Sequence, residues 1–517
     1  MAQSEVRVAK PTPTLGLTGA TMNAMALIAP GAFLWTTYQL QAAATAPDGS
    51  SVASDIWAGL AFALVLAFLT ALSYGELARL YPEAGFGSAY YFAEKAFLDR
   101  ENKSHHKFAR LAKLITGWAA HLFYWVYPGV MVAFGATLVG YIYQQFTGDT
   151  LSNYTLTAIA VLFAVGTGYI AVRGITGSTF TAIIINVIQL VTLVLFSILA
   201  IVYRLKNPAA ATTWAFSSGV DVFMPHSFSG VMVQSTIAIL VLVGFESCTA
   251  LAAETVDPHK NIPRAVILSL VVQGLFAYLF EYFAASFMVS EKLVGTDSTG
   301  AAVSGLAAAA ASSAPIGDMA ILVGNSVLGG IGFGLMITIA VTVAIAIFGT
   351  TLSCLNTAVR VSYAMAQDEE MPEILGAMHG KYATPHKAVW VLVAVSCIIG
   401  AIGVQSVVGL TGITLASNFG TFVLYGLTCI WTIIAFVQRH ERHMLRHLII
   451  PVLGLIANLM MLAAILYLYI IGNADAQHEA YICFALAGGW GLISVAYVVI
   501  GNARKGRSMM AAPRGAA

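Results

Sequence analysis

Residues 242–247 read LVGFES and place Gly244 and Glu246 inside a long apolar stretch that runs from Val222 to Phe245. A charged side chain at the depth of a bilayer is costly, so such a residue usually marks a substrate or ion pathway. A second apolar stretch is interrupted at residues 28–32, which read IAPGA. Pro30 lacks a backbone N–H and resists continuation of a helix. Two interrupted helices at matching places in two halves indicate a binding site near the middle of a membrane.

The composition places the chain in a membrane. It is 59% hydrophobic and 9% charged, whereas a soluble domain usually carries about 25% charged residues. A helical span needs roughly 20 mostly apolar residues, and uncharged runs of that length recur along the chain. The uncharged run 388–438 is too long for one span, and its glycines divide it into two helices. We therefore predict an all-α integral membrane protein with twelve transmembrane helices.

The positions of the two interruptions indicate an internal repeat. Pro30 and Gly244 are 214 positions apart, so helices one to five and six to ten are predicted to be two copies of one layout, with two C-terminal helices added. Residues 299–323, rich in Ala, Ser and Gly, are predicted to form a surface segment and not a span. The predicted organisation is a tail at 1–14, a transmembrane domain at 15–501 with repeats at about 15–203 and 228–438 and extra helices at about 445–501, and a tail at 502–517.

Basic residues predict the orientation. With twelve spans, 22 of the 25 Lys and Arg residues fall on one side, and only Arg204, Lys206 and Lys292 fall on the other. Cytoplasmic loops carry an excess of Lys and Arg. The sequence therefore predicts a multi-pass protein of the plasma or inner membrane with both termini in the cytoplasm.

Three stretches carry a family resemblance. Residues 74–91, YGELARLYPEAGFGSAYY, resemble the helix 2–3 signature of the amino acid–polyamine–organocation permeases, and residues 356–385 and 244–265 resemble two further signatures of that family. The resemblance implies a five-plus-five inverted repeat of the leucine-transporter type, followed by two C-terminal helices, that works by alternating access. Many members carry Gly-x-Gly in helix one, where this sequence has IAPG at 28–31.

The two interruptions supply the candidate binding residues. Freed N–H groups at the positive end of a half-helix suit an α-carboxylate, and freed carbonyls suit an ammonium group. The resemblance implies that an aromatic residue at the second break, Phe245, covers the substrate. Glu246 either contacts the substrate or orients a neighbour, and Tyr124 either lines the cavity or packs. The candidate substrate-binding residues are Ile28, Ala29, Pro30, Gly31, Gly244, Phe245, Glu246, Ser247, Tyr124 and Asn356.

Membrane-embedded carboxylates are candidates for proton coupling. Glu246 and Glu281 both lie inside predicted spans, and Glu246 is expected to have the larger effect on the pH dependence of transport. Some proton-driven relatives use a helix-five lysine, but no lysine occurs between Arg173 and Lys206. A sodium-coupled alternative would use helix-eight hydroxyl groups, at Thr350, Thr351 and Ser353.

These features together predict a secondary active transporter of amino acids or related amines, driven by protons or by exchange. The alternatives are a substrate-binding receptor or channel and a sodium-coupled symporter. The sequence has no Gly-Lys-Ser/Thr phosphate loop and no His-Glu-x-x-His or Gly-x-Ser-x-Gly motif, so neither an ATP-driven pump nor an enzyme is expected. No cofactor, metal or nucleic acid is expected, and the predicted partners are a small substrate and the lipid bilayer.

Overall fold

The computed structural model describes residues 13–28, 32–82, 88–100, 103–174, 179–208, 216–297, 299–382 and 384–505. In this part of the chain, ten helices are long and apolar enough to cross a membrane, and one bent pair adds an eleventh span. The short helices α1 (Leu17–Ile28) and α2 (Ala32–Ala43) lie on either side of residues 29–31, in the first predicted span. The prediction of an all-α integral membrane protein is confirmed.

The first five predicted spans correspond to helices that follow one another along the chain. After α1 and α2 they are α3 (Ile56–Leu80), α5 (Ala109–Thr147), α6 (Asn153–Val172) and α7 (Thr179–Lys206). A shorter helix, α4 (Ala89–Leu98), precedes α5. At about 1.5 Å per residue, the 39 residues of α5 extend ~58 Å. This helix is therefore longer than the hydrocarbon core is thick, about 30 Å.

The seven spans that remain follow in chain order. The bent span consists of α9 (Phe228–Ala238) and the 3₁₀ segments η4 (Ile239–Val241) and η5 (Phe245–Glu254). The seventh comprises α10 (Pro258–Ser269), the π-helical η6 (Leu270–Tyr278) and α11 (Leu279–Met288). The rest are α14 (Gly332–Gln367), α15 (His386–Gly403), α16 (Val407–Phe436), α17 (Ile450–Ile471) and α18 (Ala474–Lys505).

The sixth span begins later than the apolar pattern suggests. Residues Gly219–Phe223 form a separate short helix, α8, and α9 starts only at Phe228. Pro225 lies between them, and the backbone N–H groups of His226 and Ser227 donate to the buried carboxylate of Asp55 at 2.6 and 3.2 Å. A proline and two side-chain-bound amides interrupt the helix here.

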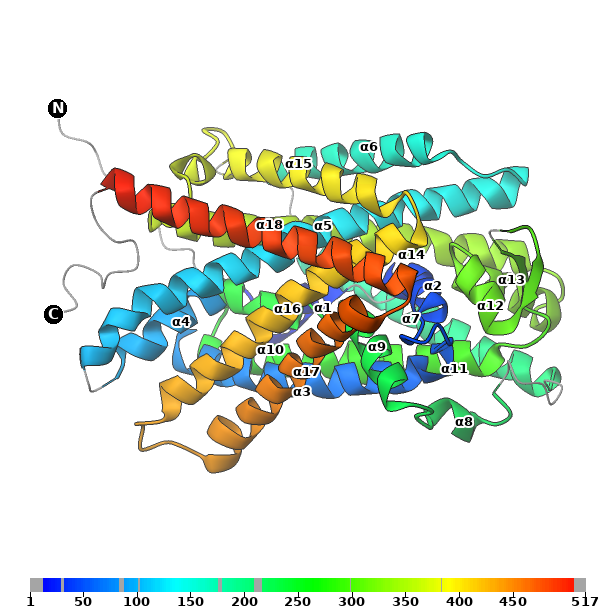
Figure 1. Cartoon of the computed structure of the whole chain (residues 1–517), viewed down its shortest axis with the longest axis horizontal. Helices are drawn as coiled ribbons and strands as arrows, with labels where there is room; N and C mark the ends of the chain where they lie inside the picture. The colour runs from blue at the N-terminus through cyan, green and yellow to red at the C-terminus, as the bar shows by residue number, and fades with distance from the viewer. Residues whose placement is uncertain are drawn as a thin grey trace.

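The spans pack as two groups (Figure 1). Helix α5 packs against α6, α14, α15 and α16, whereas α3 packs against α9, α10, α11 and α17. Helix α1 packs against α10 and η5, and therefore joins the second group. We call α5, α6, α14 and α15 the scaffold, and α1, α2, α3 and the sixth and seventh spans the bundle.

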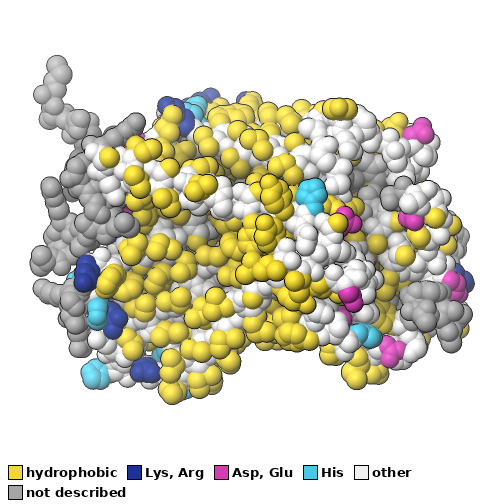
Figure 2. All heavy atoms as spheres, in the orientation of Figure 1, with side chains coloured by type: hydrophobic (Ala, Val, Ile, Leu, Met, Phe, Trp, Pro, Cys, Tyr) yellow, Lys and Arg dark blue, Asp and Glu magenta, His cyan; other side chains and the backbone are white. Residues whose placement is uncertain are grey.

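The surface matches a bilayer. Hydrophobic side chains cover the flank between the two ends of the molecule in Figure 2, while charged side chains gather at the ends. We call the end that carries Arg79, Arg100 and Arg439 the basic end, and the opposite end, with Asp221 and Asp297, the acidic end. Helix α18 lies on the outside, and only 6% of its most apolar 18 residues are buried.

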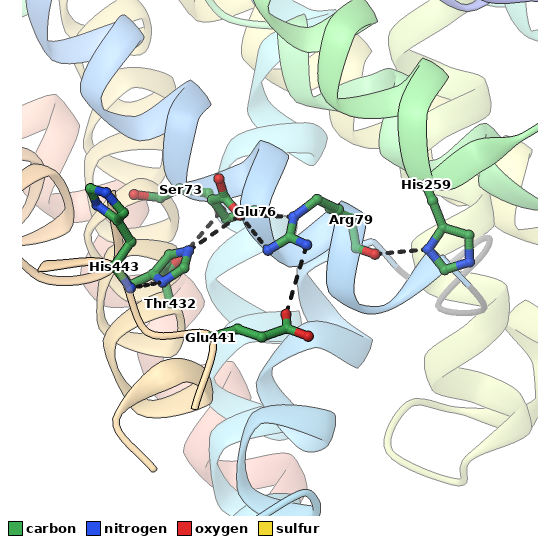
Figure 3. Close-up of polar contacts among 8 residues, drawn as sticks. Ser73, Glu76, Arg79, His259, Thr432, Glu441 and His443 are labelled. Carbon is green, nitrogen blue, oxygen red and sulfur yellow. Dashed lines mark hydrogen bonds and ion pairs between the residues drawn. The ribbon is translucent and has the colours of Figure 1, made fainter. Parts of the chain in front are cut away.

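An ionic joint ties α3 to neighbouring helices at the basic end (Figure 3). Arg79 on α3 donates to Glu76 at 3.0 Å, and its guanidinium lies 4.0 Å from Glu441, which follows α16. The Nδ1 atom of His259, on α10, lies 2.9 Å from the carbonyl of Arg79. Glu76 also lies 3.3 Å from Nε2 of His447, at the start of the α17 span. The joint therefore connects α3 to α10 within the bundle and to the segment between α16 and α17.

Short elements cover the acidic end. Residues 299–323 were predicted to form a surface segment, and they contain strand β2 (Ala302–Ser304), helix α12 (Gly305–Ala311) and most of α13 (Pro315–Val327). Strand β2 pairs antiparallel with β1 (Val294–Thr296). Pro315 occupies the first turn of α13, where a missing N–H costs nothing. Asp318 on α13 accepts a hydrogen bond of 2.8 Å from Tyr141 on α5, so this cover is attached to the scaffold.

Candidate functional site

The bent span turns at Gly244, which adopts a backbone conformation reserved for glycine. Its φ is +119°, and the two parts of the span are bent by 40°. A Cβ at this position would lie 2.9 Å from Cβ of Leu27 and 3.0 Å from the backbone nitrogen of Ile28. Glycine therefore lets the break in the sixth span approach the end of α1 at backbone distance.

Glu246 links this break to helices outside the bundle. Its carboxylate accepts hydrogen bonds from the hydroxyl of Tyr124 on α5 at 3.0 Å, from the hydroxyl of Tyr425 on α16 at 2.8 Å, and from the N–H of Gly244 at 3.1 Å. The side chain is 1% exposed. Three donors satisfy a buried carboxylate well, and their bonds join the break to α5 and α16.

Aromatic side chains surround the break. Phe245 is fully buried, and its ring centroid lies 5.2 Å from that of Tyr425 and 6.1 Å from that of Tyr74 on α3. The residues just before Gly244, from Ile239 to Val243, are also fully buried and apolar. The described wall of the site is therefore apolar and aromatic around one well-paired carboxylate.

Side chains from η6 and α14 bind the carbonyls of α1. The amide of Gln273 donates to the carbonyl of Met25 at 2.8 Å, the hydroxyl of Thr350 on α14 donates to that of Ala26 at 3.2 Å, and the hydroxyl of Tyr278 donates to that of Ile28 at 3.2 Å. The last carbonyls of a helix lack partners within the helix. These bonds hold the end of α1 in place beside the break.

The structure brings together only part of the predicted site. Ile28, Gly244, Phe245, Glu246 and Tyr124 meet at the break, as the contacts above describe. Ser247 is also buried, and its N–H donates to the carbonyl of Gly244 at 3.0 Å.

Four other candidates lie elsewhere or cannot be placed. Asn356 is half-buried on α14 and takes no part in the hydrogen bonds of Glu246 within the described residues. The candidates Ala29, Pro30 and Gly31 lie outside the described residues.

Several residues of the site were missed at the level of sequence. Tyr425, Tyr278 and Gln273 each contact the break or the end of α1, and Tyr74 was noted only as part of a family signature. Each is a polar-tipped residue within an apolar run, a signal that was available. That signal does not distinguish a site residue from an ordinary packed aromatic.

Glu281 does not join this set in the described part of the chain. It lies on α11, is 1% exposed, and its Oε2 atom has no hydrogen-bond partner there. It lines a small cavity with Trp35 of α2 and Gln189 of α7. The two carboxylates that the sequence nominates therefore have opposite environments, one with three donors and one with an unpaired oxygen.

Two of the three helix-eight hydroxyls nominated as sodium ligands, those of Thr350 and Thr351, bond to the protein itself. Thr350 donates to the carbonyl of Ala26, as noted above, and Thr351 donates to the carbonyl of Ile347 on its own helix at 2.7 Å. Among the described residues, no cluster of three or more His, Cys, Asp or Glu side chains could hold a metal ion.

Several contacts meet around Glu254 at the basic end. Arg360 on α14 forms an ion pair of 3.3 Å with Glu254 at the end of η5. The N–H groups of Thr14 and Leu15 donate to the carbonyl of Glu254 at 2.9 and 3.0 Å. The scaffold, the bundle and the segment before α1 therefore meet at one point.

Comparisons with known proteins agree with this architecture. A family profile described as amino acid permease matches residues 14–492. The chain is 24% identical over 401 residues to the branched-chain amino acid permease BcaP of Bacillus subtilis, covering 73% of each chain. It is 24% identical over 396 residues to the methylthioribose transporter of Bacillus subtilis, covering 76% of this chain and 75% of that one.

A shorter match adds a polyamine importer. The chain is 25% identical over 224 residues to the low-affinity putrescine importer PlaP of Escherichia coli, covering 43% of this chain and 44% of PlaP. The profile match spans nearly the whole chain, and the fold and the broken spans agree with a membrane transporter. The chain belongs to the amino acid permease family.

Proposed function

We propose that this protein is a secondary active transporter that moves amino acids with neutral side chains across the membrane by alternating access. The observation that carries the proposal is the break at Gly244. There a glycine with φ of +119° brings the sixth span within backbone distance of the end of α1. Secondary transporters bind their substrates at such interrupted helices.

The ends of the helices at the break suit an amino acid. Gly244 caps the N-terminal end of η5, and Ile28 ends α1. The N-terminal end of a helix favours negative charge and the C-terminal end favours positive charge. An α-carboxylate would therefore bind at the start of η5, and an α-ammonium group would bind at the end of α1.

The surroundings favour a neutral side chain. Glu246 already accepts three hydrogen bonds from the protein, so little of its hydrogen-bonding capacity is left for a cationic side chain. The described wall consists of Phe245 and the apolar residues before Gly244. The branched-chain amino acid permease of Bacillus subtilis, which matches 73% of this chain, is consistent with this class of substrate.

The mechanism would be motion of the bundle against the scaffold. The ion pair between Arg360 and Glu254 joins the two groups at the basic end, and Asp318 joins the cover to α5 at the acidic end. Breaking one set of contacts while keeping the other would open the break to one side at a time. A proton gradient or exchange against another solute would supply the driving force.

The basic end is proposed to face the cytoplasm, since cytoplasmic loops carry an excess of Lys and Arg. A cysteine replacing Glu441, whose side chain is 70% exposed, should then react with an impermeant thiol reagent only in inside-out vesicles. A cysteine replacing Tyr154, 90% exposed at the start of α6, should react in intact cells. The opposite labelling pattern would show that the basic end faces away from the cytoplasm.

Uptake by purified protein in liposomes tests the function. Neutral amino acids should enter saturably, should be stimulated by the same amino acid inside the vesicle, and should raise the thermal stability of the protein. A channel or receptor would show binding without this counterflow. Stabilisation by putrescine or methylthioribose, without any effect of amino acids, would reject the proposed substrate class.

A further inference from the structure

A second buried polar site lies beside Glu281, apart from the hydrogen bonds at the break. It is a cavity between α2, α7, α11, α13 and α14. Its polar lining includes Trp35, Gln189, Thr192, Thr342 and Glu281. The volume open to the centre of a water molecule is about 10 Å³. This volume is close to the minimum that a cavity needs to hold one water molecule.

Three buried polar atoms at this cavity have no hydrogen-bond partner within the described residues. They are Oε2 of Glu281, Nε1 of Trp35 and Oε1 of Gln189, on side chains that are 1%, 1% and 4% exposed. The set combines a donor, an acceptor and a carboxyl group. One water molecule could accept from the indole N–H and bond to both oxygens, which would satisfy all three.

The carboxyl group also needs its charge neutralised. Among the described residues Glu281 forms no ion pair, and its buried Oε2 atom has no hydrogen-bond partner. An unpaired carboxylate in an apolar interior is so unfavourable that it takes up a proton or a cation. Because Glu281 is the one carboxylate among the described residues that line the cavity, a metal cation would lack further charged ligands there, and a proton is the better match.

We propose that Glu281 carries the coupling proton of this transporter, with one water molecule in the cavity bonded to Trp35 and Gln189 as the path by which that proton enters and leaves. The proposal rests on the transport function argued above and identifies where its driving ion binds. The transfer is a plain proton exchange. The neutral carboxyl gives its proton to the cavity water to form hydronium, which departs through one opened side, and a hydronium from the other side restores the neutral carboxyl.

The position of Glu281 in the fold suits a residue that carries the coupling proton. Glu281 lies on the bundle, and Thr342 on α14 brings the scaffold to the same cavity. The hydroxyl protons of Thr192 and Thr342 are donated to carbonyls of their own helices at 2.8 and 2.7 Å. Both oxygens can therefore still accept from water or hydronium. A motion of the bundle against the scaffold would change the hydration of Glu281.

Few other titratable groups face this site. On its own helix Tyr282 is the neighbour, and on α2 Tyr38 is bonded to Ser286 at 3.1 Å. On α13, Asp318 is bonded to Tyr141, and on α7, Arg204 donates to the carbonyl of Phe216. Glu246, by contrast, already has three hydrogen-bond donors on its carboxylate. The hydrogen bonds therefore favour Glu281 over Glu246, the opposite of the ranking that the sequence suggests.

Two measurements on purified protein in liposomes test the proposal, with Glu281→Gln as the variant and Glu291→Gln, at an exposed position nearby, as the control. The first is infrared spectroscopy, in which a protonated carboxyl gives a C=O stretching band. Wild type and the Glu291 control should show a band that Glu281→Gln lacks. The absence of this difference would overturn the proposal without bearing on transport.

The second measurement separates exchange from accumulation. Glu281→Gln should keep counterflow within about twofold of wild type but lose at least tenfold in accumulation driven by a pH gradient, with choline in place of sodium. Undiminished gradient-driven accumulation would overturn the proposal, as would accumulation in wild type that requires sodium. If wild type shows neither counterflow nor accumulation, the proposed function fails, while the infrared band still reports on the proton.

A second variant guards against misfolding. If Glu281→Gln is not recovered folded, Gln189→Leu removes the acceptor at the cavity and leaves the carboxyl in place. The proposal expects it to shift the carboxyl band and to weaken gradient-driven accumulation more than counterflow. An unchanged band and unchanged accumulation would count against the cavity water.

Discussion

The carboxylate of Glu246 shows how a single buried group can hold a broken helix in place. Replacing Tyr425 by Phe removes the 2.8 Å donor from α16 and leaves the ring in position. A hydrogen bond to a charged group contributes about 1.5–3 kcal/mol, so we expect uptake to fall roughly tenfold or more and thermal stability to drop. Tyr467→Phe, at an exposed site on α17, is the matched control and should leave both unchanged.

A group of charged residues at the basic end contains another unusual carboxyl. Glu370 follows α14 and is fully buried, 3.6 Å from Nε of Arg110. Tyr90 lies 2.9 Å from both Glu370 and Asp368, and its one hydroxyl proton cannot serve two carboxylates at once. Burial raises the pKa of Glu370 to about 7, against the opposing effect of Lys113 and Arg110.

This pKa gives a stability prediction with a definite sign. The folded protein keeps the proton on Glu370 that the unfolded chain loses near pH 4.5, so stability should fall as the pH rises from about 4.5 to about 7 and then level off. The full effect is roughly 3 kcal/mol. Glu370→Gln should flatten this part of the pH profile of the unfolding temperature, whereas Glu373→Gln, nearby and exposed, should retain it. If the stability of Glu370→Gln still falls over this pH range, another titratable group causes the fall.

At the scale of elements, the break in the sixth span depends on one glycine. Gly244→Ala forces φ of +119° on a residue with a Cβ and places that atom against Leu27 and Ile28. We expect uptake to be lost while the protein still inserts into the membrane. Gly166→Ala on α6, where nothing lies within 4 Å of the added Cβ, should transport normally. Normal uptake by Gly244→Ala would remove the basis for the proposed site.

The elements were largely predictable from the sequence, but their partners were not. Apolar runs and the glycines between them predict the length of each span, and Gly244 with Glu246 predicts the broken span. These signals are local in the sequence. Tyr425 lies 179 positions from Glu246 along the chain, and nothing local marks it as the donor. Likewise, the sequence nominated Glu246 and Glu281 together. Only the packing distinguishes a carboxylate with three donors from one with an unpaired oxygen.

At the scale of the whole molecule, the ion pair between Arg360 and Glu254 joins the scaffold to the bundle. Arg360→Ala should favour opening at the basic end, which would expose Cys248, a fully buried neighbour of the break, and raise its labelling by a thiol reagent severalfold. The exchange of both charges, Glu254→Arg with Arg360→Glu, should restore protection.

Two outcomes define that experiment. Cys248→Ser in the Arg360→Ala background identifies the labelled residue, because the signal should then disappear. If Arg360→Ala leaves Cys248 as protected as in wild type, the ion pair does not control access from the basic end.

Helix α18 packs on α16 and α17, but only 6% of its most apolar 18 residues are buried. Most of these side chains therefore contact the acyl chains of the lipid, which do not distinguish Leu from Ile, Val or Phe by shape. A saturation mutagenesis scan should find the outward face of α18 permissive to exchange among apolar residues and intolerant mainly of charge. The break at Gly244 should be the reverse, since even a methyl group is excluded there. The chain thus contains two kinds of constraint, one set by the chemistry of the lipid and one by the space between two backbones.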